Sequence, residues 1–179
     1  PAACERLLRA EPTVGMAWTA ADLGLEAAAP EGLLADLDAL PFPAWDLVEV
    51  RRYAFLTLLA SRGCGHFCRY CPYVVAQGRR FRGRKPEGVL AELRWLRSRF
   101  RPERIVFRDP AFAYERERVA AICQGIVDDS TLRPGRGVDY WWWECESRPE
   151  HLDRELLRLM AQAGCQGVKV GLETVDSTL

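Results

Sequence analysis

The sequence predicts an α/β fold in which helices cover a sheet of parallel strands, and the evidence is the period of its apolar residues. From residue 53 onward, short apolar runs alternate with longer segments whose apolar residues recur at helical spacing. Such alternation predicts right-handed crossovers and a parallel sheet. The order β-α-β-α-β-α-β ends on a strand with no helix after it, so we expect a barrel cut part-way through.

Four short segments are the expected strands: 53–60, 104–109, 138–147 and 167–174. The first is almost wholly apolar, which is typical of a strand covered on both faces. The third contains three successive tryptophans, and alternation places Trp141 and Trp143 on one face and Trp142 on the other. We expect these rings to pack in the core, with an inward ring lining a substrate pocket as the alternative.

Three longer segments are the expected helices: 86–100, 115–129 and 151–164. Pro86 suits the first turn of the first helix, and Pro102 lies just beyond its end. Gly164 is placed to end the third helix. Each helix has one apolar face, formed in turn by Val89, Leu93, Leu96 and Phe100, by Val119, Ile122, Cys123 and Ile126, and by Leu152, Leu156, Leu159 and Ala163.

Residues 1–50 carry no sustained period and are predicted to be a mostly irregular linker that leads into a domain at 51–179. Pro41 and Pro43 exclude a helix there and favour an extended connector. The chain starts at Pro1 and stops just after a strand pattern, so we expect a fragment of a longer protein.

The composition excludes several classes of protein. Twenty-five basic and 25 acidic residues give zero net charge, which argues against a protein that coats nucleic acid or an acidic membrane surface. No apolar run approaches the roughly 18 residues of a membrane span. Seven cysteines, four of them scattered, do not resemble a disulfide scaffold, so we expect a reducing compartment, the cytoplasm.

Three cysteines, Cys64, Cys68 and Cys71, lie within the stretch SRGCGHFCRYCPY at residues 61–73, with the spacing C-x3-C-x2-C. They follow the first strand, and parallel α/β folds collect their chemistry at the C-terminal ends of strands. The same rule selects the polar residues that follow the other three strands: Asp109, then Glu146 and Arg148, then Glu173. We therefore expect the cysteines and these residues to share one rim.

Three kinds of metal site compete for these cysteines. Structural zinc needs four protein ligands, often two separated C-x2-C pairs, and the chain has no second pair; His66 is the one nearby candidate for a fourth ligand. A ferredoxin-type carrier needs four cysteines at its own spacings. An iron–sulfur cluster held by three thiolates, with one iron open to a small molecule, fits the number of cysteines best.

The motif Cys64-GHF-Cys68-Arg69-Tyr70-Cys71 resembles the signature of radical S-adenosylmethionine (SAM) enzymes. The resemblance implies a (β/α)6 partial TIM-like barrel whose first loop binds a [4Fe-4S] cluster through the three cysteines. It implies that SAM binds the open iron, that one electron cleaves it to a 5′-deoxyadenosyl radical, and that a protein such as flavodoxin or ferredoxin supplies the electron.

The resemblance extends over most of residues 36–179 and is strongest to the cobalamin-binding subgroup. RGRKPE leads into the first helix as R-x-R-x-P-E does in that subgroup, and the final strand ends in GLE. The segment DLDALPFPAWDL is similar to the link between a cobalamin domain and the radical domain, so cobalamin is expected on a domain outside this chain. Pro110 stands where a second acid is common after Asp109.

The resemblance also implies roles for single residues. Tyr70 is expected near the adenine, Asp109 at the methionine ammonium group and Glu173 at the ribose hydroxyls, while His66 is expected beside the cluster without binding it. Glu146 and Arg148 are further candidates for cofactor contacts, although Arg148 equally suits a pair with a neighbouring acid. The basic run at 79–85 is either a clamp for an anionic group or a solvated loop.

The functional prediction is a radical SAM enzyme, with methyl transfer as the leading reaction. The alternative is a non-catalytic module in which zinc or a cluster only folds the cysteine loop.

Overall fold

The computed structural model describes residues 33–66, 68, 71–135 and 140–171 of the 179-residue chain. These residues fall into two compact units. The first contains Gly63–Phe81, here called the cysteine loop, and the second, here called the sheet unit, contains Asp36–Arg62 and the chain from Arg82 onward. Each unit is described by itself.

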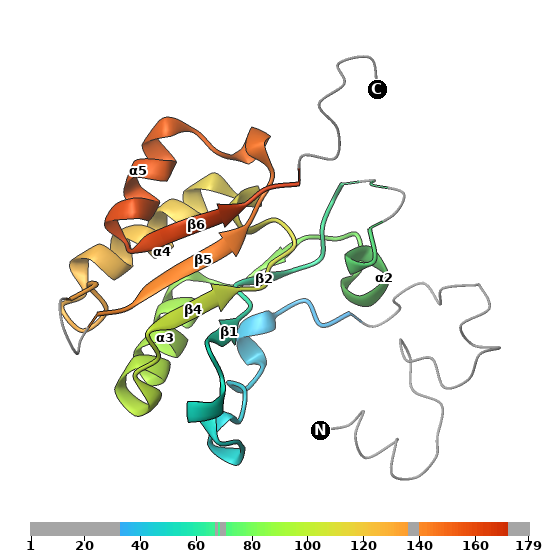
Figure 1. Ribbon diagram of the computed structural model, residues 1–179. Helices are drawn as coiled ribbons and strands as arrows, with labels where there is room; N and C mark the ends of the chain where they lie inside the picture. The colour runs from blue at the N-terminus through green and yellow to red at the C-terminus, as the bar shows by residue number, and fades with distance from the viewer. Residues whose placement is uncertain (1–32, 67, 69–70, 136–139, 172–179) are drawn as a thin grey trace, which may run out of the picture. The chain divides into compact units, whose positions relative to one another are not determined.

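In the sheet unit, four described strands form a parallel sheet in the order β1-β4-β5-β6 (Figure 1). Adjacent strands are joined by crossovers, as the alternating pattern predicted, and the four strands form an open sheet. The predicted order and parallel pairing are confirmed. The bounds are β1 Leu56–Leu58, β4 Arg104–Phe107, β5 Trp142–Glu146 and β6 Cys165–Lys169.

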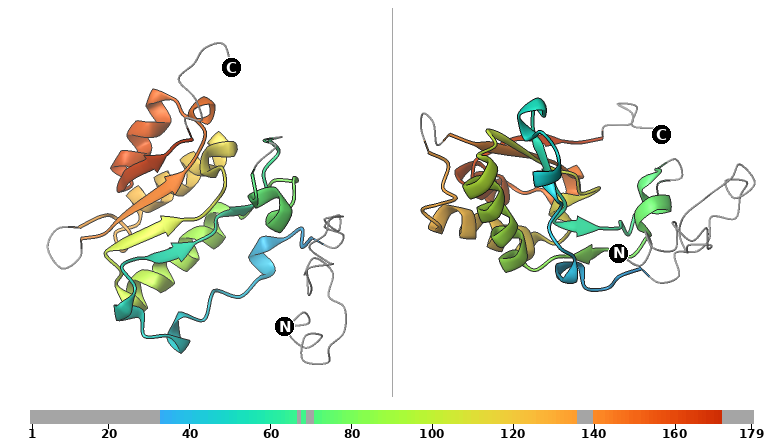
Figure 2. Two further views of the ribbon diagram at one scale, coloured as in Figure 1. Left: turned by 45° about the vertical axis from the view of Figure 1, so that its right-hand side comes forward. Right: turned by 90° about the horizontal axis from the view of Figure 1, so that it is seen from below.

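Three helices connect these strands: α3 Pro86–Phe100, α4 Arg116–Asp128 and α5 Arg154–Gln162 (Figure 2). Helix α3 begins and ends where the two prolines predicted. Asp153 caps the start of α5 by accepting a 2.8 Å hydrogen bond from the Leu156 amide, so this helix begins three residues later than expected. Gly164 adopts φ +89° just after α5, which confirms its predicted place at the helix end.

Strand β6 begins at Cys165, two residues before the predicted start. The reason is Gly164, whose positive φ turns the chain directly from the helix into the strand. The pairing of β5 with β6 then shifts between Trp143 and Glu144, which face Cys165 and Gly167, so Gln166 is an extra residue. Residues 172–174 of the predicted strand lie outside the described residues.

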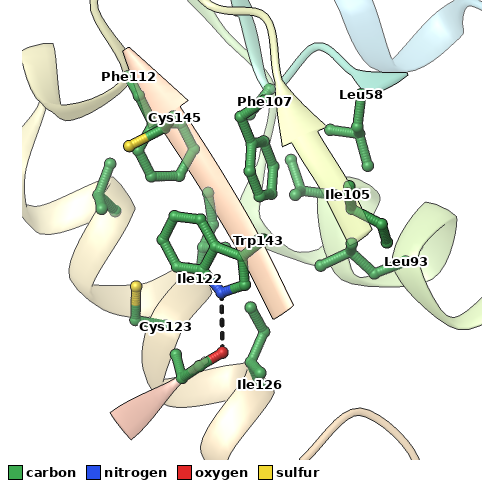
Figure 3. Close-up of a cluster of buried hydrophobic side chains, with 14 of the residues drawn as sticks. Leu58, Leu93, Ile105, Phe107, Phe112, Ile122, Cys123, Ile126, Trp143 and Cys145 are labelled. Carbon is green, nitrogen blue, oxygen red and sulfur yellow. Dashed lines mark hydrogen bonds between the residues drawn. The ribbon is translucent and has the colours of Figure 1, made fainter. Parts of the chain in front are cut away.

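The core lies on the face of the sheet that the helices cover, and Figure 3 shows its centre. Trp143 is fully buried, and its ring packs against Phe107 and Phe112 with centroid distances of 5.2 and 5.5 Å. Its indole N–H donates a 2.8 Å hydrogen bond to the Ala163 carbonyl. Trp141 is also fully buried, whereas Trp142 is not, so the predicted alternation of the three rings is confirmed.

The segment that leads into β1 packs as part of the sheet unit. Its regular structure consists of short 3-10 turns at Leu37–Ala39, Trp45–Leu47 and Val50–Arg52, and residues 33–52 contain no α-helix, as the two prolines predicted. Leu37 is buried, so this stretch contributes to the unit itself. An attachment to an upstream domain stays a prediction.

No helix within the described ranges is both long and apolar enough to cross a bilayer.

Replacing Trp143 with Phe is expected to lower the free energy of unfolding by about 2 kcal/mol, because it removes packed ring volume and the buried indole hydrogen bond. Trp142→Phe is the matched control, and it should cost less than about 0.5 kcal/mol because its ring is partly exposed. Urea unfolding of both variants measures the difference, and equal losses would contradict the assigned core.

Candidate functional site

The start of the cysteine loop is fixed by close backbone contacts. Gly63 has φ +80°, and a Cβ atom there would overlap the Arg80 carbonyl, so only glycine fits this position. The Gly63 amide donates to Gln77 Oε1 at 3.2 Å, and the Cys64 amide donates to the Gly78 carbonyl at 3.2 Å. The first cysteine is therefore held against the far end of its own loop.

The far end of the loop is a short helix, α2 (Tyr73–Gln77), which begins just after the third cysteine. Gly78 follows it with φ +80° and returns its amide to the Val74 carbonyl at 3.0 Å. The Cys71 amide donates to the Cys68 carbonyl at 3.5 Å, which turns the chain between the second and third cysteines.

None of the three motif cysteines forms a disulfide; Cys64 is buried, and Cys68 and Cys71 are half-buried. In the described part of the chain, no three His, Cys, Asp or Glu side chains gather closely enough to hold a metal ion. The fit to an iron–sulfur cluster rests on the donor set, because cysteine thiols are the ligands that such clusters require and three of them lie on one short loop. The His66 carbonyl accepts a 3.3 Å hydrogen bond from Arg79.

Both ends of the cysteine loop continue into an antiparallel ladder of the sheet unit, here called the stem. Strand β2 (Ser61–Arg62) pairs with β3 (Arg82–Gly83), so that Ser61 faces Gly83. The Arg84 amide extends the ladder with a 2.8 Å hydrogen bond to the Ala60 carbonyl. The stem closes the loop by backbone pairing.

Asp109 lies just beyond the end of β4, as predicted, and its side chain is fully buried. The Ala60 amide donates to its Oδ2 at 3.1 Å, and the Ser61 hydroxyl donates to its Oδ1. Burial raises the pKa of the Asp109 carboxyl to about 6, although the hydrogen bonds from Ser61 and Ala60 and the charge of Arg118 act in the opposite direction. Its role as a contact of the methionine ammonium group stays a prediction.

Arg84, from the basic run at 79–85, is the most heavily bonded side chain near the stem. It is 8% exposed, and its guanidinium pairs with Asp38 at 3.1 Å and with the buried carboxylate of Glu92. It also donates to the carbonyls of Leu59 and Gly88 at 3.2 and 3.1 Å. Arg84 therefore has a structural function within the basic run, because its guanidinium donors are occupied by acceptors of the protein itself.

The desolvation of Glu92 raises the pKa of its carboxyl, while the hydrogen bond and charge of Arg84 lower it in part. This buried pair therefore depends on both partners. The apolar periodicity of α3 did not predict the Arg84–Glu92 pair, because Glu92 lies among apolar residues of the helix. The signal for this pair in the sequence was Arg84, the second arginine of the R-x-R-x-P-E stretch.

The remaining predicted site residues fall into two groups. Glu146 ends β5 and pairs with Arg108 at 3.1 Å, and Arg148 pairs with Glu150, so both lie at or just after the C-terminal end of β5 in exposed ion pairs. Tyr70 and Glu173 lie outside the described residues.

The face of the sheet opposite the helices carries charged side chains that sequence reasoning missed. Arg104 and Lys169 both donate to Glu144 Oε1, at 2.7 and 2.8 Å. Arg104 also lies 4.9 Å from the Trp142 ring centroid. Burial favours a higher pKa for the Glu144 carboxyl, but the hydrogen bonds from Lys169 and Arg104 outweigh it and hold this pKa below its usual value.

The structure has a parallel α/β sheet and the chain carries the C-x3-C-x2-C motif, and comparison with known families gives the class of protein. The family model described as "Radical SAM superfamily" matches residues 58–179, more than half of the chain. The chain belongs to the radical SAM superfamily.

Similar proteins of known sequence include methyltransferases. The chain is 28% identical to "Uncharacterized methyltransferase PH0819" of Pyrococcus horikoshii, over 82% of the chain and 31% of that protein. It is 29% identical to the "Hopanoid C-2 methylase" of Rhodopseudomonas palustris, over 80% of the chain and 27% of that protein.

Among solved structures, the chain matches the radical SAM methyltransferase TsrM of Kitasatospora setae, solved with tryptophan substrate and a SAM analogue. The TM-score is 0.64 with 25% identity, and the match covers 73% of this chain and 24% of that one. Another TsrM structure carries cobalamin and a [4Fe-4S] cluster. The chain spans less than a third of the length of each of these relatives.

Arg84→Ala is expected to lower the free energy of unfolding by about 3–5 kcal/mol, because it leaves the buried Glu92 carboxylate without its cation. Arg108→Ala is the control; its pair with Glu146 is exposed and should contribute less than about 1 kcal/mol. Chemical denaturation compares the two, and a loss below about 1 kcal/mol for Arg84→Ala would show that the buried pair does not stabilise the unit.

The raised pKa of Asp109 predicts a specific pH dependence of stability. The folded protein binds this proton more tightly than the unfolded chain does, so the contribution of Asp109 to stability falls as pH rises from about 4 to about 6. The difference in unfolding free energy between wild type and Asp109→Asn, measured at pH values across this window, should change in that direction. A constant difference would contradict the raised pKa.

Proposed function

We propose that this chain is the cluster-binding part of a radical SAM enzyme that cleaves SAM reductively and belongs to the cobalamin-dependent methyltransferases. The observation that carries the proposal is the set of three cysteines at C-x3-C-x2-C, inside the segment that the family model matches. Cys64, Cys68 and Cys71 hold a [4Fe-4S] cluster in this proposal. When bound, the cluster supplies the electron that cleaves the sulfonium of SAM to methionine and a 5′-deoxyadenosyl radical.

The protein's own contribution is to fix the cysteines and to orient SAM. Gly63 and Gly78 hold the loop in a tight path around Cys64. Tyr70 against the adenine, Glu173 at the ribose, and Glu146 and Arg148 at the rim remain the proposed cofactor contacts. A small electron-transfer protein of the flavodoxin or ferredoxin type is the proposed reductant.

Methyl transfer as the overall reaction is supported by the names of the relatives. Two are methyltransferases or methylases by name, and the TsrM structures carry tryptophan or cobalamin. Cobalamin in this proposal binds a domain of the full-length protein that precedes the described residues.

Substitution of any motif cysteine by Ala is expected to abolish both the visible absorbance of the cluster and the formation of 5′-deoxyadenosine, because three thiolates are needed to hold the cluster. The experiment uses the full-length protein, reconstituted anaerobically with iron and sulfide and then reduced in the presence of SAM.

Cys123→Ala is the matched control for this experiment. Cys123 is buried among apolar residues of α4, where burial raises the pKa of its thiol to about 12, so its loss should leave cluster content unchanged. A full-length protein that binds zinc at the motif and forms no 5′-deoxyadenosine would overturn the proposal in favour of a structural metal module.

A further inference from the structure

The buried carboxylate of Asp109 contacts the residues that lead into the cysteine loop. Ala60, Ser61 and Asp109 are all fully buried in the sheet unit. The Ala60 amide occupies one carboxylate oxygen and the Ser61 hydroxyl occupies the other. Ser61 belongs to the stem, and the chain enters the cysteine loop two residues later.

Arg118 of α4 holds the same residue, Ala60, through its carbonyl group. One of its guanidinium nitrogens donates to the Ala60 carbonyl at 3.1 Å and another to the Phe112 carbonyl at 3.2 Å. Its side chain also lies directly on Gly83, where an added Cβ would approach the Arg118 Cδ to 2.9 Å. Ala60 is therefore held at its N–H by an acid and at its C=O by a cation.

This arrangement leaves no carboxylate surface for a cofactor. Asp109 is 0% exposed, and each oxygen already accepts a hydrogen bond from the chain. A SAM ammonium group would reach it only by breaking the contacts with Ala60 and Ser61. A charge-assisted hydrogen bond to a buried carboxylate is stronger than a neutral one, so these contacts are costly to break.

We propose that Asp109 is a positioning residue: it fixes Ala60 and Ser61, and through them the first turn of the cysteine loop, without contacting SAM. Its effect on the cluster rests on the function proposed above. Its effect on the stem does not depend on any cluster, so this proposal and the proposed function can fail separately.

The first test is hydrogen exchange in the full-length protein without metal. In Asp109→Asn, whose amide nitrogen cannot accept a hydrogen bond, the Ala60 and Arg84 amides should exchange at least about fivefold faster relative to the amides of α4. Ile126→Val, a mild change at a buried site of α4, is the control and should leave this ratio unchanged. An unchanged ratio in Asp109→Asn would overturn the proposal.

The second test uses the reconstituted full-length protein. Asp109→Asn and Ser61→Ala should each release iron to a chelator at least about fivefold faster than wild type, while any cluster that remains should respond to SAM with the wild-type change in its electron paramagnetic resonance spectrum. Ser61→Ala carries the test if Asp109→Asn does not fold. The spectroscopic readout separates positioning from a general loss of stability.

Two outcomes would overturn the proposal. A normal rate of iron release together with weakened SAM binding in Asp109→Asn would assign this carboxylate to the cofactor. Equal acceleration of iron release in Ile126→Val would assign the effect to overall stability. If wild type holds no cluster, the proposed function fails, and the exchange experiment still decides the role of Asp109 in the stem.

Discussion

The pairing of Ser61–Arg62 with Arg82–Gly83 is the constraint on which the rest of the structure depends. It brings together the two ends of the cysteine loop, and the sheet unit bears the entropic cost of closing that loop. Two strands of two residues are too short to be stable alone. Their stability comes from the buried charges around them, Asp109 and Arg118 at Ala60 and Arg84 at Leu59.

These buried charges are an expensive way to fix a backbone, because each must leave water. Burial lowers the pKa of Arg118, while the charges of Asp109 and Glu115 oppose that shift. The cost is offset by geometry: a planar guanidinium presents five donors in a fixed fork, whereas an ammonium group has three and an apolar side chain has none. The arginines of this domain thus connect elements distant in sequence, as Arg84 connects Asp38 to Glu92.

Features with local causes could be predicted from the sequence. Apolar periodicity and two prolines located α3, and Gly164 marked the end of α5. The spacing of Cys64, Cys68 and Cys71 indicated the radical SAM superfamily, which the family model confirms. The stem could not be predicted in this way. Its contacts join residues 48 and 58 positions apart, Ser61 with Asp109 and Ala60 with Arg118, and nothing in a two-residue strand signals its partner.

The two faces of the sheet are held together by different interactions. Along β4 and β5, Ile105 and Trp143 point into the core, while Arg104 and Glu144 lie on the opposite face. A mixed pattern of this kind differs from the doubly apolar pattern of a strand buried on both faces. On this opposite face Glu144 of β5 pairs with Arg104 of β4 and Lys169 of β6, so ion pairs join neighbouring strands. Apolar packing against the helices therefore holds one face of the sheet, while charge pairs between strands hold the other.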